Sequence, residues 1–136
     1  HFKAVNDAHG HGAGDAVLAE TAARIRSVLG QEDMAARIGG EEFLIALPGV
    51  DAATAERTGR RLCRIIAETP VALRARNETV QVTVSIGVAA IPVAAAPTPA
   101  NPGPLGAEAL LERADRALYS AKARGRNRVS AHRSAA

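Results

Sequence analysis

Hydrophobic and polar positions alternate between helical and strand spacing along this chain of 136 residues. Over residues 14–29 and Ala107–Ala123, apolar side chains recur every three or four positions, which predicts two helices that each bury one face. Asp51 suits the N-cap of a third helix that runs to about Glu68. The side chains expected to face inward are those of Val17, Leu18, Thr21, Ile25, Val28, Leu29, Ala55, Gly59, Leu62, Ile65, Ile66, Leu110, Leu111, Ala114, Leu118 and Ala121.

Strand-like runs separate these helices. Residues 34–39 and 42–47 form a predicted hairpin joined through two adjacent glycines, and residues 71–75 and 80–90 form a second across Asn77 and Glu78. A short strand is expected at 127–130. The order helix, hairpin, helix, hairpin, helix, strand predicts the α/β class: a mixed sheet covered by helices.

The remaining segments are predicted to be irregular. Residues 91–106 contain five prolines, which indicates an extended, mobile loop. Residues 131–136 are expected to be a frayed tail. The sequence shows no internal repeat, so we interpret residues 1–130 as one domain.

Composition narrows the function classes. Hydrophobic residues make up 47% and charged residues 23%, as in a folded soluble domain, and no apolar run approaches the roughly 20 residues of a membrane span. The net charge is +3, with seventeen Lys and Arg dispersed along the chain, and there are only three aromatic residues. These features argue against a base-stacking nucleic-acid partner and allow a small phosphate-bearing ligand. The single cysteine, Cys63, is interpreted as a buried side chain and fits a reducing cytoplasm.

The stretch between the first two strands carries the most informative chemistry. Glu41 and Glu42 are adjacent at the expected turn, where like charges repel each other and bury nothing. Two carboxylates placed together are suitable ligands for a hard divalent cation, whose charge offsets that repulsion. Gly39 and Gly40 are expected to supply positive φ and to let the backbone approach a phosphate.

Two further segments fit the same kind of ligand. Residues 121–127 place three cations at a helix end, which suits a phosphate site but equally suits simple complementarity to the helix dipole. Residues 6–15 form a polar, glycine-rich turn that leads into a helix. Taken together, the acidic hairpin, the basic helix end and the polar turn favour a nucleoside triphosphate with its metal.

Four blocks in order make the chain resemble the GGDEF family of diguanylate cyclases, from Phe2 to about Val129. The blocks are Phe2-Lys3-x-x-Asn6-Asp7-x-x-Gly10-His11-x-x-Gly14-Asp15, Arg37-x-Gly-Gly-Glu-Glu-Phe43, Val84-Ser-Ile-Gly-Val88 and Ala114-Asp-x-Ala-Leu-Tyr-x-Ala-Lys-x-x-Gly-Arg-Asn127. The resemblance implies a fold like the palm of nucleotide polymerases and nucleotidyl cyclases, with a mostly antiparallel central sheet flanked by helices. It also implies condensation of two GTP molecules into cyclic di-GMP by a homodimer, with Mg²⁺ or Mn²⁺ as cofactor.

The resemblance also implies roles for individual residues. Glu41 would bind the metal and assist deprotonation, Glu42 would be a second metal-site or a ribose-side carboxylate, and Gly39 and Gly40 would line the phosphates. Asn6 and Asp15 would read the guanine. The residues implied to hold the phosphates are Phe2, Lys3, Lys122 and Arg126.

The metal site departs from the family pattern. The family places a metal-binding aspartate on a strand just before the Phe-Lys pair, and here only His1 precedes Phe2. We interpret the sequence as an N-terminally truncated piece of a longer protein, and expect it to be nearly inactive by itself. The alternative is a degenerate, non-catalytic GGDEF module that binds GTP or cyclic di-GMP as a regulatory element. An upstream sensory domain is expected in the parent, with the output domain in the cytoplasm and a membrane anchor on the sensor as one option.

A second departure concerns product inhibition. Many family members carry Arg-x-x-Asp before the signature, where the product binds, and here the matching residues are Gly30 and Asp33. Without the arginine, the bidentate grip on the ligand is absent. Arg61 could add a secondary contact or could simply be a solvated charge. The sequence therefore predicts weak or no product inhibition at this site.

Overall fold

The computed structural model describes residues 2–74, 77–91 and 106–132. The chain divides into two compact units, residues 1–48 with 64–83 and residues 49–63 with 84–136, and each unit is described by itself. Most of the expected proline-rich loop and the end of the expected tail, residues 92–105 and 133–136, lie outside the described residues.

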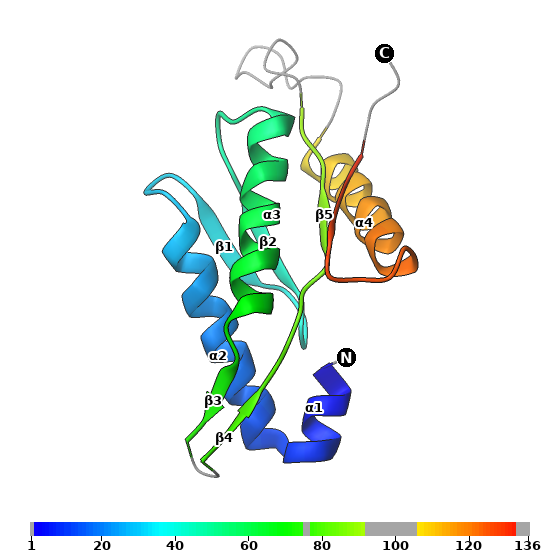
Figure 1. The fold of residues 1–136 in the computed structure, drawn as a ribbon. Helices are drawn as coiled ribbons and strands as arrows, with labels where there is room; N and C mark the ends of the chain where they lie inside the picture. The colour runs from blue at the N-terminus through cyan, green and yellow to red at the C-terminus, as the bar shows by residue number, and fades with distance from the viewer. Residues whose placement is uncertain (1, 75–76, 92–105, 133–136) are drawn as a thin grey trace. The chain divides into compact units, whose positions relative to one another are not determined.

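The first unit begins with two helices, α1 (Phe2–His9) and α2 (His11–Val28), which meet at Gly10 (Figure 1). The prediction of a glycine-rich turn over residues 6–15 was therefore wrong. Only Gly10 leaves helical geometry, with φ at +83°, a value that favours glycine over residues with a side chain. α2 starts three residues earlier than expected, and Gly12 and Gly14 lie inside it despite their low helix propensity.

The first predicted hairpin is confirmed. Strands β1 (Met34–Arg37) and β2 (Phe43–Ala46) pair antiparallel, with Met34 opposite Ala46 and Arg37 opposite Phe43. In β3 (Val71–Leu73) and β4 (Glu78–Val80), Val71 pairs with Val80 in the same antiparallel sense.

The long strand predicted over residues 80–90 was wrong, because β4 ends at Val80 and a separate strand, β5 (Ile86–Val88), belongs to the second unit. β3 is only three residues long, so it offers β4 no further backbone partner. The side-chain amide of Gln81 instead donates a hydrogen bond to the carbonyl of Ala67, which draws the chain away from the ladder.

Helix α3 (Ala52–Glu68) starts at the expected N-cap. The backbone N–H of Thr54 donates to Oδ1 of Asp51 at 2.7 Å. Hydrogen bonding from the side chain of Thr54, and then from its backbone, holds the pKa of Asp51 below its ordinary value of 3.8. Cys63 on α3 is buried as expected, and burial raises the pKa of its thiol.

A buried arginine that the sequence pattern did not single out joins α2 to the end of α3. Arg24 is 7% exposed and sits on the buried face of α2. Its guanidinium donates to the carbonyl oxygens of Ile66, Thr69 and Pro70 at 3.4, 2.5 and 3.3 Å, and its Nε to Glu20 at 2.9 Å. Carbonyls at a helix C-terminus lack intrahelical partners, so Arg24 supplies the donors that the end of α3 needs.

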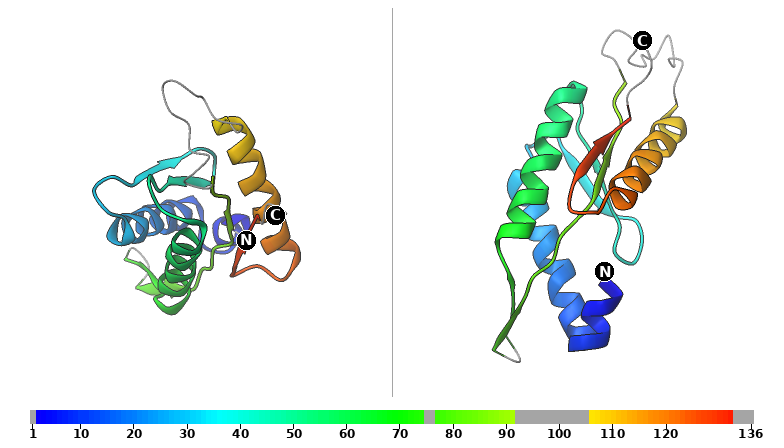
Figure 2. Two further views of the ribbon diagram at one scale, coloured as in Figure 1. Left: turned by 90° about the horizontal axis from the view of Figure 1, so that it is seen from above. Right: turned by 45° about the vertical axis from the view of Figure 1, so that its right-hand side comes forward.

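In the second unit, β5 pairs in parallel with β6 (Val129–Ala131), and α4 (Ala107–Ala123) packs on this pair (Figure 2). Gly87 on β5 lies so close to α4 that an added Cβ would be 2.8 Å from the Cα of Leu118. Ala117 and Ala121 are buried on α4, whereas Leu111 is 37% exposed, so the expectation that it faces inward was wrong.

The predicted α/β class is confirmed, with one difference in the sheet. The described strands form three two-stranded sheets rather than one mixed sheet, two of them antiparallel and one parallel. Among the helices in the described part of the chain, none has the length and apolar character needed to cross a membrane.

Candidate nucleotide and metal site

The signature turn, defined here as Ile38–Glu42, closes the β1–β2 hairpin. The N–H of Ile38 donates to the carbonyl of Glu42 at 2.9 Å, and the side chains of Glu41 and Glu42 are exposed. The expectation of positive φ at Gly39 and Gly40 was wrong, because the turn spreads over more residues than a tight two-residue hairpin. An added Cβ on Gly39 would lie 3.1 Å from Oε2 of Glu42, a close approach that the exposed glutamate side chain could relieve by a small shift.

Gly40 leaves the backbone of the turn open. An added Cβ there would meet nothing within 4 Å, and the residue is exposed. The carbonyl oxygens of Gly39 and Gly40 both accept hydrogen bonds from the guanidinium of Arg37, at 3.1 Å and 2.8 Å. Arg37 was part of the predicted signature but had no predicted role; the only sequence signal for one was its place next to the turn.

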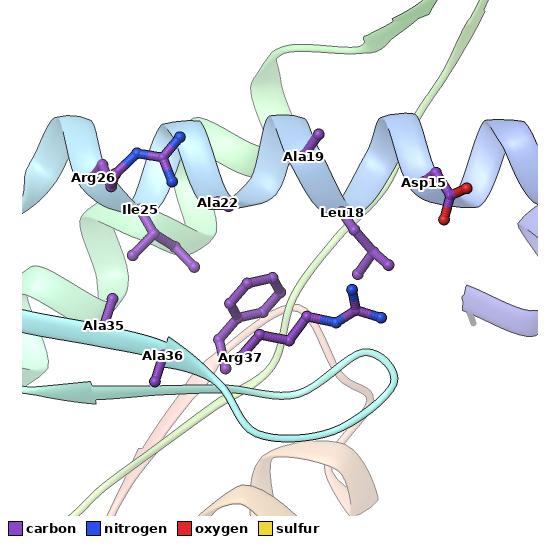
Figure 3. A pocket seen from close by; sticks show the side chains of 10 residues that line it. Asp15, Leu18, Ala19, Ala22, Ile25, Arg26, Ala35, Ala36 and Arg37 are labelled. Carbon is purple, nitrogen blue, oxygen red and sulfur yellow. The ribbon is translucent and has the colours of Figure 1, made fainter.

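An open groove of about 490 Å³ lies between α2 and the β1–β2 hairpin (Figure 3). Its apolar floor comes from both elements, and Asp15 and Arg37 add a carboxylate and a guanidinium to its edges. The groove is lined by Asp15, Leu18, Ala19, Ala22, Ile25, Arg26, Ala35, Ala36, Arg37 and Phe43. The structure thus brings Asp15 and the last residue before the signature turn to one cavity.

Asn6 occupies the corner where α1 packs on α2. Its side-chain oxygen is buried and has no hydrogen-bond partner among the described residues. An added Cβ on Gly14 would collide with this oxygen and would lie 2.9 Å from Cζ of Phe2. Buried acceptors in native proteins are nearly always paired, so this unpartnered oxygen, packed against α2 next to the exposed Asp15, is unusual.

The donor atoms of the signature turn fit part of a divalent-cation site. Carboxylate oxygens are the ligands that Mg²⁺ prefers, and Mg²⁺ commonly takes only one or two of them together with substrate phosphates. Within the described ranges, no group of three or more His, Cys, Asp and Glu side chains is placed to hold a metal ion. Glu41 and Glu42 are therefore candidate ligands, two carboxylates on one exposed turn.

Of the other residues implied to contact phosphates, Lys3 lies exposed on α1 and Phe2 is partly buried beside Gly14. Lys122 and Arg126 belong to the second unit and are exposed at the C-terminal end of α4. The N–H of Arg126 donates to the carbonyl of Ala121 at 3.0 Å, and Gly125 and Arg126 both have positive φ. This tight turn directs a second cation to the helix end that carries Lys122.

The segment matching the inhibitory motif forms a local turn. Oδ2 of Asp33 accepts a hydrogen bond from the N–H of Gly30 at 2.8 Å, and the N–H of Asp33 donates back to the carbonyl of Gly30 at 3.3 Å. Asp33 therefore has a structural partner within its own turn. Arg61 is exposed on α3, in the other unit.

Comparison with known proteins identifies the family of the chain. The family model "Diguanylate cyclase, GGDEF domain" matches residues 1–128. Diguanylate cyclase A of Treponema denticola is 39% identical over 129 residues, which cover 95% of this chain and 32% of that protein. The chain thus spans about a third of the length of this curated relative.

Two solved structures have the same fold. The GGDEF domain of DgcB from Caulobacter crescentus, in complex with c-di-GMP, superposes with a TM-score of 0.83 at 36% identity, covering 98% of this chain and 73% of that one. The active GGEEF domain of a diguanylate cyclase from Vibrio cholerae gives a TM-score of 0.79 at 31% identity, covering 98% of this chain and 78% of that one. The chain belongs to the GGDEF-domain diguanylate cyclase family.

Proposed function

We propose that this chain is the output domain of a diguanylate cyclase, which joins two GTP molecules into cyclic di-GMP and releases two pyrophosphates. The observation that carries the proposal is the groove between α2 and the β1–β2 hairpin, which is lined by Asp15 and by Arg37, the residue before the signature turn. Asn6, Asp15 and the two glutamates of the turn belong to the same unit, which supports a common nucleotide site.

The chemistry of guanine explains why Asn6 and Asp15 would select it. Guanine presents the N1–H and the 2-amino group side by side, two donors that adenine does not offer in that arrangement. The carboxylate of Asp15 and the amide oxygen of Asn6 are acceptors for them. A site built from buried acceptors rejects a ligand without matching donors, because those acceptors would be left unpaired.

The triphosphate and its metal would bind at the signature turn and the basic side chains. Glu41 and Glu42 would hold Mg²⁺ or Mn²⁺, and the open backbone at Gly39 and Gly40 would lie against the phosphates. When bound, the metal would stabilise the charge on the phosphates and lower the pKa of the attacking hydroxyl. The other phosphate contacts that we propose are Phe2, Lys3, Lys122 and Arg126.

The reaction requires two copies of the chain. Each protomer would hold one GTP, and the 3′-hydroxyl of one GTP would attack the α-phosphorus of the other. Each attack forms a 3′-oxygen–phosphorus bond, breaks the bond to the β-phosphate and releases the hydroxyl proton, to which Glu41 is the proposed acceptor. The homodimer would bring the two nucleotides face to face.

We further propose that the 136 residues turn GTP over slowly by themselves. Two carboxylates lie on the signature turn, and within the described ranges no third His, Cys, Asp or Glu side chain joins them. In the longer cytoplasmic parent, a preceding segment would complete the site and a sensory domain would control the pairing of protomers. The same shortage of ligands favours the second candidate function, a non-catalytic module that binds GTP or cyclic di-GMP.

Nucleotide titration and turnover assays separate these functions. We expect the chain to bind GTP more tightly than ATP, and a longer chain that includes the preceding residues to form cyclic di-GMP with Mg²⁺ or Mn²⁺. Glu41→Gln in that longer chain should abolish turnover and leave GTP binding measurable. GTP binding without turnover in the longer chain would favour the binding module. No preference for GTP over ATP in either chain would overturn both functions.

A further inference from the structure

Arg37 makes contacts that tie the signature turn to the strand before it. It is the last residue of β1 and pairs with Phe43, the first residue of β2. Its Nε donates to the carbonyl oxygens of Gly39 and Gly40 at 3.1 and 3.2 Å, and its Nη2 donates to that of Gly40 at 2.8 Å. One guanidinium thus holds two successive carbonyls of the turn.

Few other bonds fix this turn. The β1–β2 ladder ends at Arg37 and Phe43, and the bond from Ile38 N–H to the Glu42 carbonyl is the remaining backbone closure that the described residues provide. Glycine has more conformational freedom than any other residue type, and the turn contains two adjacent glycines, Gly39 and Gly40. Without Arg37, their carbonyls would be left to water and the turn could take many shapes.

The same side chain also borders the groove. Figure 3 shows Arg37 extending from the end of β1 toward Leu18 and Asp15 on α2. The guanidinium therefore lies between the proposed guanine-reading carboxylate and the turn that carries Glu41 and Glu42.

We propose that Arg37 is a positioning residue that sets the shape of the signature turn at the edge of the groove, and thereby the placement of the Glu41 and Glu42 carboxylates. The proposal rests on the proposed function for its effect on turnover, whereas the hold on the turn stands on the hydrogen bonds alone. Lysine cannot replace arginine here, since a single ammonium lacks the planar fork of donors that spans two carbonyls.

The first test measures the turn itself and needs no enzymatic activity. Backbone ¹⁵N order parameters of Gly39 and Gly40 would be compared in the chain and in its Arg37→Gln and Arg37→Lys variants. We expect values near those of a rigid backbone, about 0.85, to fall below about 0.6 in Arg37→Gln. The Ile38 amide should also exchange with solvent about tenfold faster once the turn is released. Arg37→Lys should resemble Arg37→Gln in both the order parameters and the exchange rate.

The second test measures turnover in the longer chain. In Arg37→Gln we expect kcat to fall at least tenfold, the metal concentration for half-maximal activity to rise several-fold and the KM for GTP to change less than threefold. Arg57→Gln is the matched control, because Arg57 is an exposed arginine whose guanidinium contacts Thr54 on its own helix. It should leave the order parameters and kcat unchanged.

The outcomes distinguish the hold of Arg37 on the turn from its effect on turnover. Unchanged order parameters in Arg37→Gln would overturn the positioning role, whatever the activity. Lower order parameters at Gly39 and Gly40 with an unchanged kcat would also overturn it, since the shape of the turn would then not matter for the reaction. A third outcome is that Arg37→Gln lowers the order parameters but the wild-type longer chain makes no cyclic di-GMP. That result would support the hold of Arg37 on the turn and would overturn the proposed cyclase function.

Discussion

Asn6 and Gly14 pack so closely that the side-chain oxygen of Asn6 takes up the space of a β-carbon on residue 14. Gly14 is buried inside α2, where glycine costs helix stability, and Phe2 crowds the same position at 2.9 Å. Because residue 14 has no side chain, Asn6 and Phe2 can pack against α2. The spacing of Asn6 and Gly14 in the family motif reflects this contact between two helices.

Substituting Gly14→Ala should destabilise the protein by about 1–3 kcal/mol, the usual cost of overpacking, despite the better helix propensity of alanine. Gly12→Ala is the matched control, because it lies in the same helix and an added Cβ there meets nothing within 4 Å. That variant should gain about 0.4–1 kcal/mol. Urea denaturation measures both. Equal stability of the two variants would show that the contact with Asn6 is not tight in solution.

Arg24→Met should lower the free energy of unfolding by about 1–3 kcal/mol, because carbonyls at the end of α3 would lose their donor in a buried place. The exposed Arg26→Met, two residues along the same helix, should stay within about 0.5 kcal/mol of wild type. Chemical denaturation of the pair checks the difference. A loss shared equally by both variants would point to a general effect of charge on α2.

Asp15→Ala should weaken GTP binding and blur the choice between GTP and ATP. An unpaired buried donor costs about 1–3 kcal/mol, so the preference for GTP should fall by roughly 5- to 150-fold. Calorimetric titration with each nucleotide gives the ratio. Glu68→Ala, which removes an exposed carboxylate at the end of α3, should leave that ratio unchanged. Full GTP preference in Asp15→Ala would remove Asp15 from the guanine site.

Apolar periodicity predicted the helices α2 and α3 and much of the core. The inward-facing Val17, Leu18 and Ile25 are buried on α2, and Asp51 caps α3 as its place before an apolar run indicated. The pattern did not predict α1, because the helix has only eight residues and the glycines that follow it at 10, 12 and 14 favoured a turn. Arg24 was missed for a related reason, because a charged residue is expected outside unless its partners are known.

The candidate site was predicted from motif and chemistry rather than from geometry. The sequence identified Asn6, Asp15 and the two glutamates, and the structure places Asp15 and the hairpin on one groove. Sequence alone could not show that the oxygen of Asn6 is orphaned, or that Arg37 spans two carbonyls. The first fact depends on the packing of α1 against α2, and the second on the local conformation of the turn; spacing along the chain encodes neither.

The turn at Gly30 and Asp33 leads to a prediction about feedback by the product. Asp33 already accepts a hydrogen bond from the N–H of Gly30, and no arginine stands beside it to grip a phosphate or guanine. Cyclic di-GMP should therefore bind the wild-type chain weakly at this turn. A Cβ on Gly30 would lie 3.4 Å from Oδ2 of Asp33, an ordinary contact, and the φ of Gly30 is not positive, so an arginine can be accommodated.

Gly30→Arg should therefore strengthen cyclic di-GMP binding at least tenfold, equivalent to about 1.4 kcal/mol, by adding a planar pair of donors. Gly30→Lys is the matched control, since it adds the charge without the fork and should gain much less. Calorimetric titration of each variant with cyclic di-GMP measures the effect, and adding Asp33→Ala to Gly30→Arg should cancel it. Micromolar binding by the wild type that disappears in Asp33→Ala would instead mean that the site works without its arginine.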